Sequence, residues 1–145
     1  MIDKNREKRY KEKIELGEKR IIEIEEWISA NDEKTKLACY KAFQELAEIS
    51  SDLIAMQIKD KNKLVEDDYK NIEKLKEIGI INEKEMKLLE DVNGLRNRII
   101  HKYNKTDDSL AKESIKTLLP HLKIILKKLD LKDEQPNNKQ TQKRL

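Results

Sequence analysis

Glycine, proline and aromatic residues are scarce in this chain of 145 residues, which has 3 Gly, 2 Pro and 4% aromatic residues. So few turn-forming residues exclude a β fold that depends on many tight turns. No apolar run approaches the roughly 18 residues needed to cross a membrane. Cys39 is the single cysteine, so it cannot form an internal disulfide, and it fits a reducing compartment. Because the first residues are polar and unlike a signal peptide, we expect a cytoplasmic protein without a membrane segment.

Charge is abundant: charged residues make up 42% of the chain and apolar residues 37%, a balance that by itself is typical of disorder. The apolar residues recur at steps of three and four, however, which indicates amphipathic helices. The net charge of +3 neither indicates nor excludes a local nucleic-acid-binding patch. We therefore expect a folded, all-α domain with a heavily charged surface.

About five helices are expected, joined by short links into an antiparallel bundle. The first spans about residues 4–30, the second ends near residue 59, and the fourth runs through Gly94 to about Lys102. The residues expected to start or end helices are Asn31 or Asp32, Asp67 or Asp68, Gly79, the pair Asn82 and Glu85, and Thr106 or Asp107. Residues 1–131 should form the bundle, and residues 132–145, which are polar and lack periodicity, a disordered tail.

The second expected helix has a buried stripe that includes two polar residues, Ser50 and Gln57. Its other members are Cys39, Phe43, Leu46 and Leu53, flanked by Tyr40, Ala47 and Ile54. The polar pair leaves open whether the whole stripe is buried.

The fourth expected helix has two opposite stripes when residues are placed at about 100° intervals. The core stripe consists of Leu88, Val92, Leu95 and Ile99. The polar stripe consists of Glu90, Gly94, Asn97 and His101. Because glycine inside a helix costs about 1 kcal/mol relative to alanine, Gly94 indicates a close approach by another backbone or a ligand.

Three residues of this helix suggest a site. Asn97 lies four residues before His101, so it can hydrogen-bond one ring nitrogen and leave the other free as a base. Arg96 lies about 140° round a regular helix from His101. Either the helix unwinds near His101, or a second copy supplies the missing group. Gly94 favours the second solution, a homodimer whose two-fold axis brings both pairs into one cleft.

These residue types suit RNA cleavage without a metal or cofactor. His101 can take the proton of a ribose 2′-hydroxyl, whose oxygen then attacks the adjacent phosphorus and forms a 2′,3′-cyclic phosphate. Arg96 can stabilise the charge that grows on the phosphoryl oxygens. Arg98 and Lys102 are candidate phosphate contacts, and exposure to solvent is the equal alternative. One cysteine and two distant histidines make a zinc site improbable.

Residues 96–103, RNRIIHKY, resemble the R-x-x-x-x-H-x-Y signature of HEPN domains, specifically that of the HepT toxins. Arg96, His101 and Tyr103 fall on its three defined positions, and Asn97 matches the polar residue usual after the arginine. The likeness extends over residues 69–107. It implies a helical homodimer, a metal-independent endoribonuclease that acts as a toxin, and a minimal nucleotidyltransferase as cognate antitoxin. It also implies that the antitoxin can adenylylate Tyr103, which would add bulk and negative charge beside the RNA cleft.

Other interpretations of the same residues stay open. Arg96 and His101 can be part of a solvated helical face, and Tyr103 can be a core or interface aromatic because it projects within about 40° of Ile99. The chain can also be a non-catalytic, nucleotide-binding or partner-binding subunit of a nucleotidyltransferase, or a structural adaptor. His121 is expected to be structural or exposed. Cys39 is expected in the core rather than as a nucleophile.

Overall fold

The computed structural model describes residues 3–102 and 108–131, and within these ranges the chain forms five helices and no strand. The helices are α1 (Lys4–Trp27), α2 (Glu33–Asp60), α3 (Asp68–Glu77), α4 (Glu83–Lys102) and α5 (Asp108–Lys128). The predicted all-α class is confirmed. The predicted tail and the predicted start of the fifth helix at Thr106 or Asp107 lie outside the described residues.

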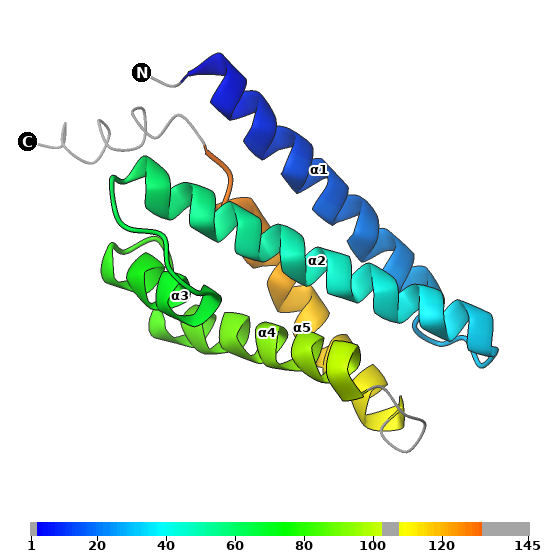
Figure 1. Cartoon of the computed structure of the whole chain (residues 1–145). Helices are drawn as coiled ribbons and strands as arrows, with labels where there is room; N and C mark the ends of the chain where they lie inside the picture. Colours follow the sequence, from blue (N-terminus) through cyan, green and yellow to red (C-terminus); the bar gives the residue numbers. More distant parts are fainter. Residues whose placement is uncertain (1–2, 103–107, 132–145) are drawn as a thin grey trace, which may run out of the picture.

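The long helix α2 is at the centre of the bundle (Figure 1). Helix α1 runs antiparallel along one side of α2, and α3 and α4 lie along another side. Helix α5 passes behind α2 in this view and packs against both α1 and α4. Helix α4 is therefore supported by α2, α3 and α5, and part of its circumference remains open to solvent.

The residues predicted to cap helices are at the starts of α2, α3 and α4 and at the end of α3. The carboxylates of Asp32 and Asp67 each accept the backbone N–H three residues on, at 2.9 Å, and so cap α2 and α3. Asn82 and Glu85 form a reciprocal capping box before α4, with bonds of 2.9 and 2.8 Å. Gly79 has a φ of 87°, the left-handed conformation that lets the chain leave α3 without strain.

The end of α1 differs from the prediction. The helix ends at Trp27 rather than near Ala30. Residues 28–32 instead form the connection that two antiparallel helices need, and the Ala30 carbonyl accepts a bond of 2.9 Å from Lys112 Nζ of α5. The periodicity of the apolar residues continues through this turn, so the pattern alone overestimates the length of the helix.

The buried stripe of α2 includes its two polar members. Ser50 and Gln57 are 2% and 5% exposed. Ser50 Oγ donates to the Leu46 carbonyl at 3.0 Å, and Gln57 Nε2 donates to the Leu129 carbonyl at 3.0 Å. Because each polar group has a partner, its burial carries no unpaired-group penalty. The question that the sequence left open is settled: the whole stripe is buried.

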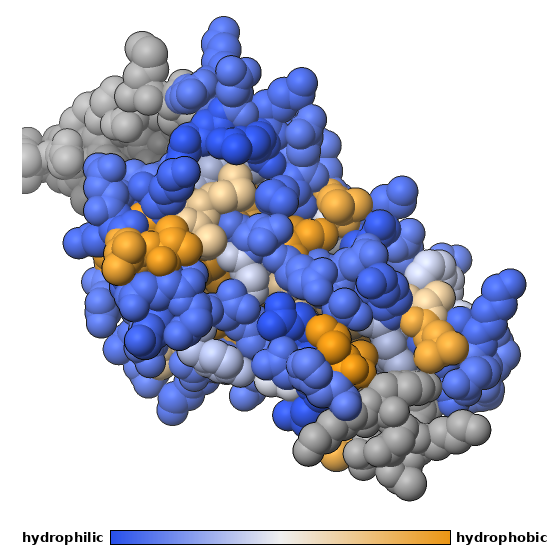
Figure 2. Space-filling model, in the orientation of Figure 1, coloured by the Kyte–Doolittle hydropathy of each residue, from blue (hydrophilic) through white to orange (hydrophobic). Residues whose placement is uncertain are grey.

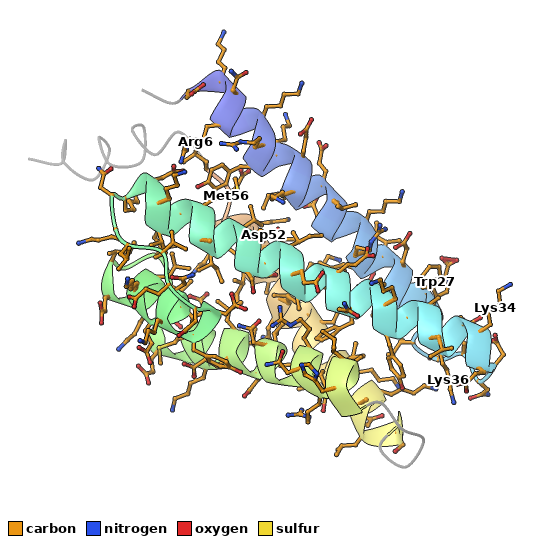
Figure 3. All side chains as sticks on the ribbon, in the orientation of Figure 1. Arg6, Trp27, Lys34, Lys36, Asp52 and Met56 are labelled. Carbon is orange, nitrogen blue, oxygen red and sulfur yellow. The ribbon has the colours of Figure 1, made fainter. Side chains whose placement is uncertain are left out.

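A polar cluster joins the beginning of α1 to the end of α2. Tyr10 Oη, fully buried, donates to Asp60 Oδ2 at 2.5 Å, and Arg6 forms an ion pair with the same carboxylate. Figure 3 shows Arg6 on the N-terminal turns of α1, near the C-terminal end of α2. Burial, together with the hydrogen bond to Asp60, raises the pKa of Tyr10 far above its usual range.

The face in Figure 2 is mostly hydrophilic, with hydrophobic patches separated from one another. One patch lies over the connection between α2 and α3, where Leu64 is 72% exposed and Val65 is 42% exposed. Across the ranges that the structure describes, none of the helices has the length and apolar character to cross a membrane.

Candidate active site

The buried face of α4 is broader than the predicted stripe. Val92, Leu95 and Ile99 are buried as expected, but Leu89 is buried at 2% exposure, whereas Leu88 is only partly buried. The buried side also includes Asn93, at 3% exposure. This face is wider because α4 contacts α2 and α3 on one side and α5 on another. Arg96 consequently projects from the middle of this buried face of α4.

Arg96 is enclosed along most of its side chain, which is 17% exposed. Its Nη2 donates to Asn97 Oδ1 at 3.1 Å and lies 3.5 Å from Asp68 Oδ2 of α3. Its Nε is buried and has no hydrogen-bond partner among the residues that the structure describes. The guanidinium is thus hydrogen-bonded within α4 and ion-paired with α3, while its stem lies against the bundle.

The guanidinium of Arg96 bonds to a residue of the polar stripe that also includes His101. In a regular helix Asn97 lies about 100° round from Arg96, and His101 lies about 40° further in the same direction. Arg96 is therefore bonded to the residue that lies between it and His101 around the helix. His101 itself is exposed.

Two of the predicted relations at this site are not seen. Helix α4 remains helical through Lys102, the last residue described before residue 108, so within this range it does not unwind at His101. Among the described residues, Asn97 does not hydrogen-bond His101; its carbonyl oxygen accepts from Arg96 instead. The adjacent arginine is the stronger donor because it is charged. One chain thus brings Arg96 and Asn97 together and leaves His101 beside them without a bond to either.

Gly94 lies on an open groove of about 600 Å³ between α4 and α5. The groove is lined by Tyr69, Glu90, Asp91, Gly94, Arg98, Glu113, Ser114, Thr117 and Leu118. A Cβ atom added to Gly94 would lie 3.7 Å from Arg98 Nη1 and 3.9 Å from Tyr69 Oη, which are ordinary contact distances. The packing of this chain therefore does not require glycine at position 94.

The structure describes some of the remaining candidate residues and not others. Arg98 is exposed at the groove, as a phosphate or solvent contact would be, and His121 is exposed on α5. Tyr103 and the side chain of Lys102 lie outside the described residues. Cys39 is 2% exposed, and burial raises the pKa of its thiol to about 11, so it is a core residue and not a nucleophile. Among the described residues, no group of three His, Cys, Asp or Glu side chains could hold a metal ion.

Two polar residues near the site were not found from the sequence. Asp68 was considered only as a possible helix cap, although it faces Arg96 across the α3–α4 contact. Asn93 is buried, with Oδ1 accepting from Ser51 Oγ at 3.4 Å and Nδ2 without a partner in residues 3–102 and 108–131. Neither contact has a signal in the sequence, because Asp68 and Arg96 are 28 positions apart and Ser51 and Asn93 are 42 positions apart.

The fold and the site together define an all-helical protein with an arginine, an asparagine and an exposed histidine on one helix. Residues 10–129 match the family described as Ribonuclease HepT-like. The chain belongs to this family, which confirms the resemblance seen in residues 96–103.

Relatives of known name agree with the family. Two proteins of Archaeoglobus fulgidus, each named "Putative RNase", are 42% and 41% identical to this chain over 113 residues. The matches cover 78% and 76% of this chain and 85% and 82% of the relatives. A similarly named protein of Methanocaldococcus jannaschii is 46% identical over 66 residues, which are 46% of this chain and 76% of the relative. No solved structure matches the chain at a significant level.

Proposed function

We propose that this chain is the toxin of a toxin–antitoxin pair and that it cleaves RNA without a metal ion in a homodimer cleft, in the cytoplasm. The observation that carries the proposal is the guanidinium of Arg96, hydrogen-bonded to Asn97 and ion-paired with Asp68, on the same helix as the exposed His101. Membership in the HepT-like family and the names of the relatives support a ribonuclease.

The chemistry follows from the two side chains. His101 accepts the proton of a ribose 2′-hydroxyl, and the 2′ oxygen attacks the adjacent phosphorus. The bond from phosphorus to the 5′ oxygen breaks, and the proton held by an imidazole passes to that oxygen. The products are a 2′,3′-cyclic phosphate and a 5′-hydroxyl. Arg96 stabilises the charge on the phosphoryl oxygens during the transfer.

The groove beside Gly94 supports a second copy rather than RNA as its occupant. Glu90, Asp91 and Glu113 place three carboxylates on its lining against the single cation of Arg98. Such a lining repels a phosphate backbone and suits the basic side chains of another protein surface. Gly94, which the chain's own packing does not need, lets a second backbone approach α4 closely. The two-fold relation would place two Arg96 and two His101 residues around one cleft.

The test is cleavage of RNA by the purified chain in EDTA. We expect Arg96→Ala and His101→Ala to lower the rate by a factor of about 10² or more, because each removes a group that acts in the transition state. His121→Ala is the matched control, since it removes the other exposed histidine. A DNA strand of the same sequence should remain intact because it lacks the 2′-hydroxyl. Undiminished cleavage by both site variants would exclude this mechanism.

The proposed pairing with an antitoxin is tested separately. Induction of the wild type should arrest growth, and induction of His101→Ala should not. Co-expression of a small nucleotidyltransferase encoded next to this chain should restore growth. Mass spectrometry should then find adenylyl groups on the peptide that contains Tyr103. A stable complex with that nucleotidyltransferase, without RNA cleavage by the free chain, would instead identify a non-catalytic binding subunit.

A further inference from the structure

We propose that Asp68, the first residue of α3, is a positioning residue that orients the guanidinium of Arg96 for RNA cleavage. This inference rests on the proposed function. Asp68 Oδ2 lies 3.5 Å from Arg96 Nη2, the same nitrogen that donates to Asn97 Oδ1. The hydrogen bond to Asn97 and the ion pair with Asp68 come from different helices, so together they restrict one end of the guanidinium.

The neighbouring Asp67 caps α3, so the contact between Asp68 and Arg96 can be tested separately from helix capping. Asp67 Oδ1 accepts the N–H of Lys70 at 2.9 Å and caps α3. Asp68 is inside the first turn, and its carboxylate lies 3.5 Å from Arg96 Nη2. The two adjacent carboxylates thus belong to two structures, the helix end and the candidate site.

Arginine needs such a restraint because its long side chain has many rotamers, and phosphate recognition depends on the orientation of the planar guanidinium. Burial of the stem at 17% side-chain exposure and the enclosed Nε limit the first torsions of Arg96. Asn97 and Asp68 fix the last ones through Nη2. Both contacts use Nη2, so neither of them occupies the two hydrogens of Nη1.

A carboxylate close to an RNA site also repels the substrate. This repulsion allows kinetics to distinguish a positioning residue from a nearby surface charge. If Asp68 were merely a nearby surface charge, its removal would tighten RNA binding and leave turnover unchanged. If it orients Arg96, its removal lowers kcat, because a small misplacement of a transition-state donor is costly. KM should then stay the same or fall.

The kinetic experiment compares Asp68→Asn with Asp67→Asn. Each removes one negative charge from adjacent positions, and asparagine caps a helix as well as aspartate does. We expect kcat to fall about tenfold in Asp68→Asn and to stay within about twofold of the wild type in Asp67→Asn. Asp68→Glu keeps the charge within reach of Arg96 and should retain more turnover than Asp68→Asn. A melting curve for each variant confirms that it folds.

A second measurement needs no RNA. Arginine Nε–H resonances in the NMR spectrum of the free protein report how firmly each guanidinium is held. Asp68→Asn should shift the Arg96 resonance and speed its exchange with water. The resonance of Arg20, which is bound by Glu23 and Glu45 at 2.8 and 2.7 Å, should not change.

Lower kcat together with an altered Arg96 resonance supports the positioning role. Unchanged kcat, or lower kcat with an unaltered Arg96 resonance, overturns it. A wild-type chain that does not cleave RNA refutes the proposed function and the catalytic meaning of this contact, and the NMR result then shows only whether the ion pair exists.

Discussion

Replacement of Gly94 by alanine should stabilise the single chain and weaken the proposed dimer. Alanine in a helix interior is favoured over glycine by about 1 kcal/mol, because glycine loses more backbone freedom on folding. The added methyl has room, since its nearest neighbours would be Arg98 Nη1 at 3.7 Å and Tyr69 Oη at 3.9 Å. We therefore expect the free energy of unfolding to rise by about 0.5–1 kcal/mol and the melting temperature by about 3 °C.

The dimer should respond in the opposite direction. An extra methyl at a close backbone contact costs about 1–3 kcal/mol by overpacking, which weakens association about tenfold or more. Urea unfolding at low protein concentration measures the first effect, and analytical ultracentrifugation measures the second. Each must be followed over a range of concentrations, because dimerisation itself stabilises the fold. RNA cleavage should fall with the fraction of dimer.

Gly17→Ala is the matched control, because it makes the same change inside another helix. A Cβ atom at position 17 would lie 2.8 Å from Leu126 Cδ2, whose side chain is fully buried. That overlap should cancel the gain in helix propensity and leave the chain no more stable than the wild type. If Gly94→Ala destabilises the single chain, the reasoning about space at position 94 is wrong. If it stabilises the chain and the dimer is unchanged, Gly94 is not at the interface.

Two further predictions concern the stability of the bundle. An unfolded tyrosine ionises near pH 10, whereas folding raises the pKa of Tyr10 well above that value. At about pH 10 and above, the unfolded state therefore binds fewer protons than the folded state, and the free energy of unfolding falls as pH rises. Tyr10→Phe should cost about 1 kcal/mol at pH 7 and should lose less stability than the wild type between pH 9 and 11; equal losses in urea titrations would contradict the assignment. Gln57→Leu removes the donor to the Leu129 carbonyl, which follows the last turn of α5, and should cost about 1–3 kcal/mol in the same assay. An unchanged urea midpoint would mean that this carbonyl finds another partner.

The parts of the fold that were predictable depend on residues close together in the chain. Asp32, Asp67 and the pair Asn82 and Glu85 act on backbone groups three residues away, and Gly79 acts through its own φ. The spacing of the apolar residues depends only on the roughly 3.6-residue repeat of a helix, so it predicted where the helices lie without knowledge of their packing. Where the chain turns while the pattern continues, as after Trp27, the same rule failed.

The family signature likewise placed Arg96, Asn97 and His101 on one helix, because it is a run of adjacent residues. Only the tertiary structure showed that Arg96 projects from a mostly buried face and that its guanidinium is held at Asn97 and Asp68. Which side of α4 is buried depends on the positions of α2, α3 and α5, and those positions follow from the packing of the whole chain. A contact between α3 and α4 leaves no local sequence pattern, because it forms only when the two helices pack together in the folded chain.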